Sequence, residues 1–80
     1  MRIYMRRYQV FDETINGELG EYVTFGIVIF EDINEKMTEL LRVHDISTNR
    51  LAVEKLVEAC NREQLSPCHI YDVIEDGLYG

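Results

Sequence analysis

The sequence predicts an α+β fold, in which a three-stranded antiparallel sheet is followed by two helices packed on one face (β-β-β-α-α). Three observations support this prediction. The first half of the 80 residues is rich in β-branched and aromatic side chains, the second half spaces its apolar residues at helical intervals, and the connecting segments are short. Since a chain of this length supplies one hydrophobic core, we expect residues 1–80 to form a single small domain.

Three strands are expected in the first half. The first covers Arg2–Asp12 and is followed by Asn16-Gly17, a strong turn signal. The second, Glu21–Glu31, is β-branched or aromatic nearly throughout, and the third is Met37–His44. Because the segments between them are short, neighbouring strands should pair antiparallel.

Two helices are expected in the second half. An apolar stripe runs through Asn49–Glu63, and either Ser47 or Thr48 is its expected N-cap. A Ser-Pro pair then signals the start of a second helix over Cys68–Asp76, which Gly77 should end.

Alternation along the second strand predicts which face of the sheet meets the helices. Its odd-numbered positions from Val23 to Ile29 are uniformly apolar and should face them. The opposite face also carries apolar and aromatic side chains where a solvated face would be polar. We expect a second copy of the chain to cover it, the alternatives being a loop, the tail or another partner. The residues expected on this face are Tyr4, Tyr8, Tyr22, Val28 and Phe30.

The charge of the chain disfavours a nucleic-acid partner. Eight basic against 15 acidic residues give a net charge of -7, whereas phosphate binding needs a basic footprint. The charge is uneven, because Arg2, Arg6 and Arg7 stand among the first ten residues, which hold no acid. This segment is expected to be a basic edge strand beside an acidic body. The alternative is a docking strip for an anionic partner, including an acidic patch on another copy.

From the cysteine content and the hydropathy we expect a cytoplasmic protein with reduced thiols. Its two cysteines are too few for a disulfide framework. The N-terminus has no apolar segment of the signal-peptide type. The longest apolar run, Ile27–Phe30, is far shorter than the roughly 20 residues that span a bilayer. We therefore expect no membrane partner.

Two stretches of the sequence resemble a known family. They are Gly-Glu-Tyr-Val-Thr-Phe-Gly-Ile at 20–27, and the segment from Asp45 onward that includes Cys-Asn-Arg-Glu-Gln-Leu-Ser-Pro-Cys-His-Ile-Tyr-Asp-Val-Ile-Glu-Asp. In these strings the chain resembles an uncharacterised family of short bacterial proteins, a domain of unknown function. The resemblance covers Tyr4 to about Leu78. It implies a single-domain, cytoplasmic, bacterial protein and brings no activity, ligand or catalytic residue with it.

Reactive side chains concentrate between Cys60 and Asp76. A zinc site needs three or four converging ligands, which Cys60, Cys68, His69 and Asp72 offer in principle, with His44 as a substitute from the sheet. Against this, the chain has no Cys-x-x-Cys pair, and Cys60 lies on the apolar stripe of the first helix. We therefore expect no cofactor and keep the metal site as an alternative.

Catalytic arrangements are poorly supported. Consecutive residues on a helix point about 100° apart, so Cys68 and His69 cannot form a nucleophile–base pair by themselves. The neighbouring carboxylates fall in polar stretches that a solvated face explains. We expect no enzyme and no catalytic residue.

The leading hypothesis is a non-catalytic protein-interaction or regulatory module that self-associates as a homodimer or binds another protein. One alternative is a small-ligand or metal-binding protein that uses the Cys60–Asp76 helix junction. The other is an RNA-contacting sheet that uses Arg6, Arg42 and the tyrosines. Alternation places Arg6 and Arg7 on opposite faces, which weakens this last hypothesis.

Overall fold

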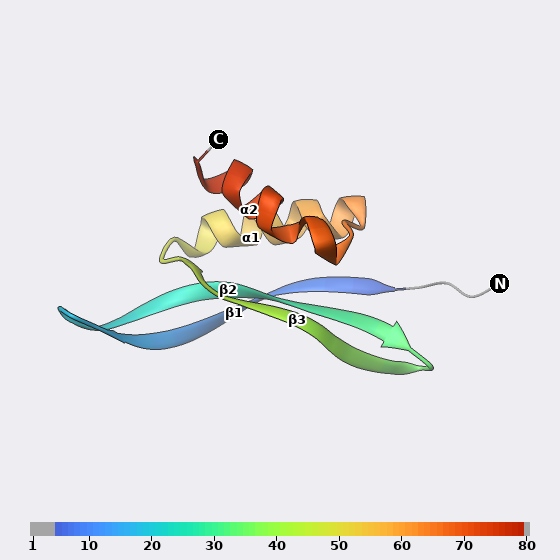
Figure 1. Cartoon of the computed structure of the whole chain (residues 1–80), viewed down its shortest axis with the longest axis horizontal. Helices are drawn as coiled ribbons and strands as arrows, with labels where there is room; N and C mark the ends of the chain where they lie inside the picture. Colours follow the sequence, from blue (N-terminus) through green and yellow to red (C-terminus); the bar gives the residue numbers. More distant parts are fainter. Residues whose placement is uncertain (1–4, 80) are drawn as a thin grey trace.

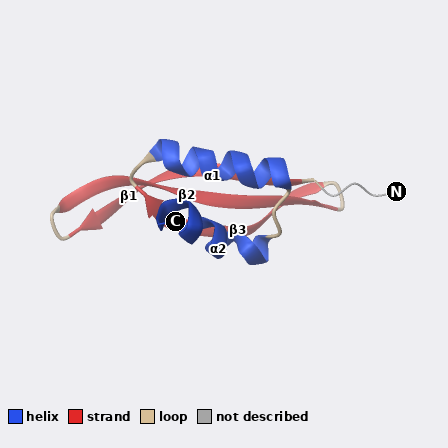
Figure 2. Cartoon of the chain, turned by 90° about the horizontal axis from the view of Figure 1, so that it is seen from above, coloured by secondary structure: helices blue, strands red, loops and turns tan. Residues whose placement is uncertain are grey.

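The computed structural model describes residues 5–79 and confirms the α+β fold class. The chain forms β1 (Arg6–Gly17), β2 (Gly20–Ile33), β3 (Lys36–Ser47), α1 (Arg50–Glu63), the short 3-10 helix η1 (Pro67–His69) and α2 (Ile70–Tyr79). The sheet has the order β1-β2-β3, and both pairs of strands are antiparallel. Both helices lie on the same face of the sheet, where Figure 2 shows them next to each other.

The strands are longer than expected because the turns between them contain only two residues each. Gly17 pairs with Gly20, so the first turn is formed by residues 18 and 19 and β1 continues well past its expected end. The second turn is formed by Asn34 and Glu35, whose φ angles are 52° and 67°. Positive φ at both central residues characterises the tight hairpin turn whose twist matches the flanking strands.

The hydrophobic core lies between the sheet and α1. The buried residues of the helix are Val53, Leu56, Val57 and Cys60. They pack with Ile27 and Ile29 of β2, which are fully buried as their alternation predicts. Val23 belongs to the same series but is 52% exposed, because β1 and β2 extend past the helices at their hairpin end (Figure 1).

Tyr8 lies in this core, so its prediction as a residue of the opposite face is wrong. It pairs with Ile29, and directly opposite residues of an antiparallel pair share a face. Only 1% of the residue is exposed, and its hydroxyl donates a hydrogen bond to the carbonyl oxygen of Leu65. Burial raises the pKa of Tyr8 to about 12. Tyr4 lies outside the described residues.

The N-cap of α1 is Asn49, not Ser47 or Thr48 as the sequence suggested. The Asn49 side-chain oxygen accepts a hydrogen bond of 3.3 Å from the backbone N–H of Ala52. The Ser47 hydroxyl instead accepts the Asn49 N–H at 3.0 Å and so shapes the approach to the helix. Each side chain accepts a backbone N–H near the start of α1, but only Asn49 accepts one from a residue of the helix itself.

Gly77 does not end the second helix, contrary to expectation. It lies inside α2, where a Cβ atom would collide with the Leu56 side chain of α1. The glycine therefore permits close packing of α2 against α1 and does not end the helix.

The longer helix, α1, has 14 residues. Within residues 5–79, no helix has the length and apolar character needed to cross a membrane.

Asn61 of α1 is bonded to the backbone of the edge strand β1. Its side-chain oxygen accepts the Tyr8 N–H at 2.7 Å, and its side-chain nitrogen donates to the Tyr8 carbonyl at 2.9 Å. The Gln64 side chain adds a bond of 3.2 Å to the carbonyl of Arg6. An amide side chain thus takes the place of a neighbouring strand at Tyr8.

Replacement of Asn61 should destabilise the fold strongly. Asn61→Ala leaves the part-buried N–H and C=O of Tyr8 without partners, so we expect a loss of about 2 kcal/mol in the free energy of unfolding. The matched control is Arg62→Ala, the next and exposed residue of α1, which should change stability by less than about 0.5 kcal/mol. Urea unfolding followed by circular dichroism measures both. Equal effects of the two substitutions would contradict this role.

Candidate interaction surface

The face of the sheet opposite the helices, called the open face below, carries side chains from all three strands. Gln9 pairs with Val28, and Val28 pairs with Arg42, so these three lie on it together. No other element of residues 5–79 lies over this face (Figure 1). Among its side chains are those of Arg7, Gln9, Phe11, Glu13, Ile15, Tyr22, Thr24, Val28, Phe30, Glu39, Arg42 and His44.

Gly26 leaves a gap in the middle of the open face, and Phe11 fills it. A Cβ atom at position 26 would lie 2.7 Å from the Phe11 ring and would also collide with a backbone oxygen of β3. The Arg42 guanidinium lies 4.8 Å from the centre of the Phe11 ring, and the His44 ring meets it edge-on at 5.5 Å. This arrangement combines a cation–π contact with an aromatic pair over the gap.

A hydrogen-bonded cluster, formed by Glu13, Tyr22, Thr24, His44 and Asp45, lies beside the Phe11 ring. The Glu13 carboxylate accepts the His44 Nδ1–H and the backbone N–H of Asp45, both at 2.9 Å. The Asp45 carboxylate accepts the Thr24 hydroxyl at 2.8 Å and the Tyr22 hydroxyl at 3.2 Å. The cluster therefore ties all three strands together across the open face.

An irregularity in β3 places Asp45 in this cluster. The register between β2 and β3 shifts between Phe25 and Ile27, where Val43 and Ser47 are the successive partners. Asp45, in the intervening segment, has a φ angle of 47°. Aspartate tolerates this left-handed conformation better than most residues, and bulges commonly redirect a side chain in this way.

The electrostatics of the open face follow from these bonds. The hydrogen bond from His44 lowers the pKa of Glu13 below its usual range. Likewise, the Arg42 guanidinium lowers the pKa of Glu39, to which it is bonded at 2.6 Å. Desolvation, together with the neighbouring Asp45 carboxylate, raises the pKa of Tyr22. The carboxylates of Glu13 and Glu39 are thus held in their charged forms by partners within the sheet.

The residues that the sequence predicted for the face opposite the helices lie in several different environments. Tyr22 and Phe30 lie on the open face and are 38% exposed and half-buried, respectively. Val28 also points to it but is only 4% exposed. Tyr8 is on the helix side, as described above. The apolar surface of the open face is therefore smaller than the sequence suggests, because its own side chains cover part of it.

The residues predicted for a metal site do not come together. Cys60 is buried in the core, and this burial raises the pKa of its thiol. Cys68 is exposed, with its sulfur 3.3 Å from the Ser66 hydroxyl. His69 and Asp72 lie on exposed positions of η1 and α2. In the described part of the chain, no three His, Cys, Asp or Glu side chains are grouped so that they could hold a metal ion.

The arginines of the RNA hypothesis already have partners within the chain. Arg6 donates to the carbonyl of Leu65 at 2.9 Å and pairs with Glu31 at 3.3 Å. Arg42 is bonded to Glu39 and stacked on Phe11. A phosphate would compete with these contacts for the guanidinium groups.

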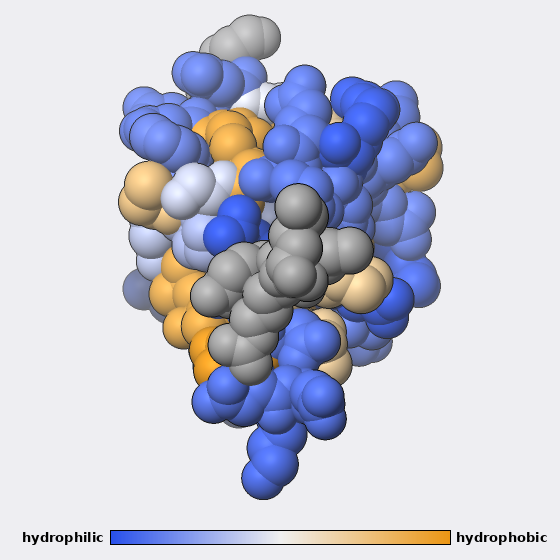
Figure 3. Space-filling view, turned by 90° about the vertical axis from the view of Figure 1, so that its right-hand side faces the viewer, coloured by the Kyte–Doolittle hydropathy of each residue, from blue (hydrophilic) through white to orange (hydrophobic). Residues whose placement is uncertain are grey.

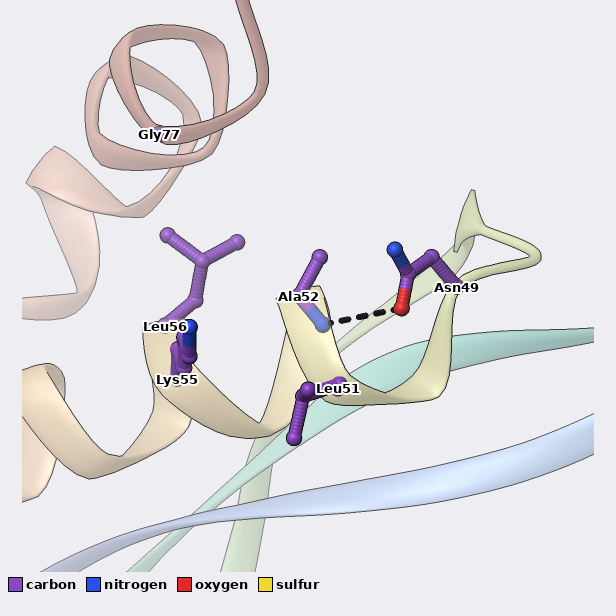
Figure 4. A pocket seen from close by; sticks show the side chains of 6 residues that line it. All are labelled: Asn49, Leu51, Ala52, Lys55, Leu56 and Gly77. Carbon is purple, nitrogen blue, oxygen red and sulfur yellow. Dashed lines mark hydrogen bonds between the residues drawn. The ribbon is translucent and has the colours of Figure 1, made fainter.

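A groove of about 360 Å³ lies between the start of α1 and the end of α2. Figure 4 shows the Leu51, Ala52 and Leu56 side chains below Gly77 of α2. Among the described residues that line it, Lys55 is the one ionisable side chain. These described residues offer apolar contact but no converging set of polar groups for a small ligand.

The end of the molecule where β2 turns into β3 has a mixed surface. In Figure 3 hydrophilic side chains dominate this end, and hydrophobic ones lie in separate groups between them. Met37 of β3 is among the exposed apolar residues. The apolar surface visible here is therefore divided, unlike a single large docking patch.

Sequence reasoning missed most of the hydrogen-bonded cluster. Gly26 lies inside a strand that the sequence predicts clearly, and a glycine at such a position indicates that another group packs closely against it, as Phe11 does. No comparable signal exists for Asp45, since its position depends on an irregularity that only the paired strands define.

The Glu13–His44 pair predicts a measurable titration. Carboxyl signals followed by NMR should give Glu13 a pKa below the ordinary value of about 4.3, and His44→Ala should raise it. Because the folded pKa is lowered, the pair's contribution to stability is present above about pH 4.3 and is lost as the pH falls through the folded pKa. Glu39 is the internal comparison, since its pKa is lowered mainly by the hydrogen bond from Arg42, which the variant keeps, and should therefore rise less than that of Glu13. An unchanged Glu13 pKa would contradict the pairing.

Comparison with known proteins identifies a family. No curated protein and no solved structure matches the chain. The model of a family described as "Family of unknown function (DUF6514)" matches residues 1–79. The resemblance to an uncharacterised family is thereby confirmed, and the bacterial origin stays a prediction. The chain therefore belongs to the DUF6514 family of unknown function.

Proposed function

We propose that the protein is a non-catalytic interaction module that works as a homodimer and uses its sheet as the contact surface. One observation carries the proposal. The helices cover only one face, and the β1–β2 hairpin extends beyond them, which leaves the open face and part of the β1 edge without a covering element among the described residues (Figure 1). The molecule is accordingly elongated, with extents of 52 × 28 × 18 Å.

The placement of the reactive side chains supports a binding role over the alternatives. Cys60 serves the core, while Cys68, His69 and Asp72 do not converge with it. The guanidinium groups of the RNA hypothesis are held by internal ion pairs. The open face, in contrast, has no covering element among the described residues, and hydrogen bonds hold part of its side chains, which lowers the entropy lost on binding; these are the side chains of Glu13, Tyr22, Thr24, Arg42 and His44.

The proposal includes a cytoplasmic setting in a bacterium. Both cysteines are free thiols, one buried and one exposed. A reducing compartment suits such a pair, because it keeps the exposed Cys68 from forming disulfides.

Native mass spectrometry of the gently purified protein, supported by sedimentation at about 10–200 μM, tests this proposal. We expect a species near twice 9.4 kDa, without adduct. Cys68→Ser is the matched control, since its dimer cannot arise from oxidation of the exposed thiol. A monomer over the whole concentration range would contradict the homodimer. A single chain carrying a metal or small molecule would favour the ligand-binding alternative.

A further inference from the structure

We propose that two copies of the chain pair along β1, through residues 10–16, to form one continuous six-stranded sheet. This inference rests on the proposed homodimer and specifies its geometry. The two β1 strands would run antiparallel about a two-fold axis, so each copy presents the same segment to the other.

The first step is to identify which backbone groups of β1 point away from β2. The N–H and C=O of Tyr8 do so, because both bind the side chain of Asn61 rather than β2. In an antiparallel strand this direction recurs at every second residue. The same outward direction therefore holds for Val10, Asp12, Thr14 and Asn16. Among residues 5–79, no hydrogen bond to these outward backbone groups is present.

The second step is the contrast between the two edges of the sheet. Residues 10–16 contain no Pro, Lys or Arg, and the register between β1 and β2 is uninterrupted over all twelve pairs. Natural proteins often protect an exposed edge with Pro, with Lys or with a bulge, and residues 10–16 have none of these. The β3 edge has two register shifts and carries Lys36, Glu39 and Arg42. With one open edge per copy, pairing closes at a dimer and does not continue into a fibre.

The third step is the register. Pairing of the whole open segment with itself requires the two-fold axis at Glu13, which sets Val10 opposite the partner's Asn16 and Asp12 opposite the partner's Thr14. Four hydrogen-bonded residue pairs then supply about eight backbone bonds. On the open face, Phe11 comes opposite the partner's Ile15, an aromatic–aliphatic pair of the kind that stabilises sheets.

The charge on the axis is already directed away from the partner. Glu13 would face its own copy, which is unfavourable for two free carboxylates. Its carboxylate, however, reaches across β2 to His44 and the Asp45 N–H of β3. These internal hydrogen bonds thus draw aside the carboxylates of the one like-charged pair that this register sets directly opposite each other.

The fourth step is the space available for a partner. The β1–β2 hairpin protrudes beyond the start of α1 (Figure 1). At the other end of β1, Asn61 and Gln64 occupy the edge at Tyr8 and Arg6. A second strand is therefore blocked at Arg6 and Tyr8, whereas no side chain of the described residues is bonded to the outward backbone groups of residues 10–16.

The direct test is a proline at an outward position. Thr14→Pro removes an outward N–H and blocks strand addition, while the bonds between β1 and β2 remain. We expect the dimer dissociation constant, measured by sedimentation, to rise by about tenfold or more. Thr14→Val, which keeps the N–H, is the matched control and should dimerise like the parent. Circular dichroism verifies that both variants are folded.

Cysteine cross-linking gives an independent readout that needs no loss of stability. In a Cys68→Ser background, Glu13→Cys places one thiol from each copy at the axis, within disulfide range for an antiparallel pair. Mild oxidation should convert most of this variant into a covalent dimer. Gln9→Cys in the same background is the control, because four residues from the axis its two copies lie about 27 Å apart.

The outcomes separate this inference from the proposed function. A monomeric parent protein overturns both. A dimer that persists in folded Thr14→Pro, or equal cross-linking at positions 9 and 13, overturns the β1 pairing and leaves the homodimer standing. A dimer lost in Thr14→Pro and cross-linked selectively at position 13 supports the pairing.

Discussion

The bond between the Asn61 side chain and the backbone of Tyr8 fixes the relation between the helix layer and the sheet. It fastens α1 to an edge strand by two hydrogen bonds, and Tyr8 itself fills the core beneath the helix. The neighbouring loop is tied to the same strand through Arg6 and the Tyr8 hydroxyl. Because α1 is anchored at this end of β1, the other end of the β1–β2 hairpin remains outside the helix layer.

This anchoring gives the two edges of the sheet different characters. The edge of β1 is closed by side-chain amides near the helices and is regular and unprotected farther along. The edge of β3 is irregular, and that irregularity aims Asp45 at Thr24 and Tyr22. The same bonds that order the open face also draw the Glu13 carboxylate away from the β1 edge. The hydrogen bonds of Glu13 with His44 and Asp45 therefore both order the open face and leave the β1 edge accessible to a second strand.

The order of elements could be predicted from sequence because each signal is local. Dense β-branched residues defined β2, and helical spacing defined α1. The face of Tyr8 could not be predicted, since it depends on the register of β1 against β2, which the two-residue turn after Gly17 sets. Gly77 lies inside α2 because it packs against Leu56 of α1, a contact that the local sequence does not reveal. Nothing in the sequence around Asn61 indicates that its side chain bonds to the edge strand β1. The open-face cluster was missed for the same reason, because its members meet only after three strands have paired.

Amide hydrogen exchange, followed by NMR at two protein concentrations, tests the central claim most directly. We predict that the Tyr8 amide exchanges slowly at both concentrations, because Asn61 accepts it within one chain. The amides of Asp12 and Thr14 should exchange rapidly at about 10 μM and become protected at about 500 μM, where copies pair along β1. Rapid exchange of Asp12 and Thr14 at both concentrations, beside protected neighbours that bond to β2, would contradict the account.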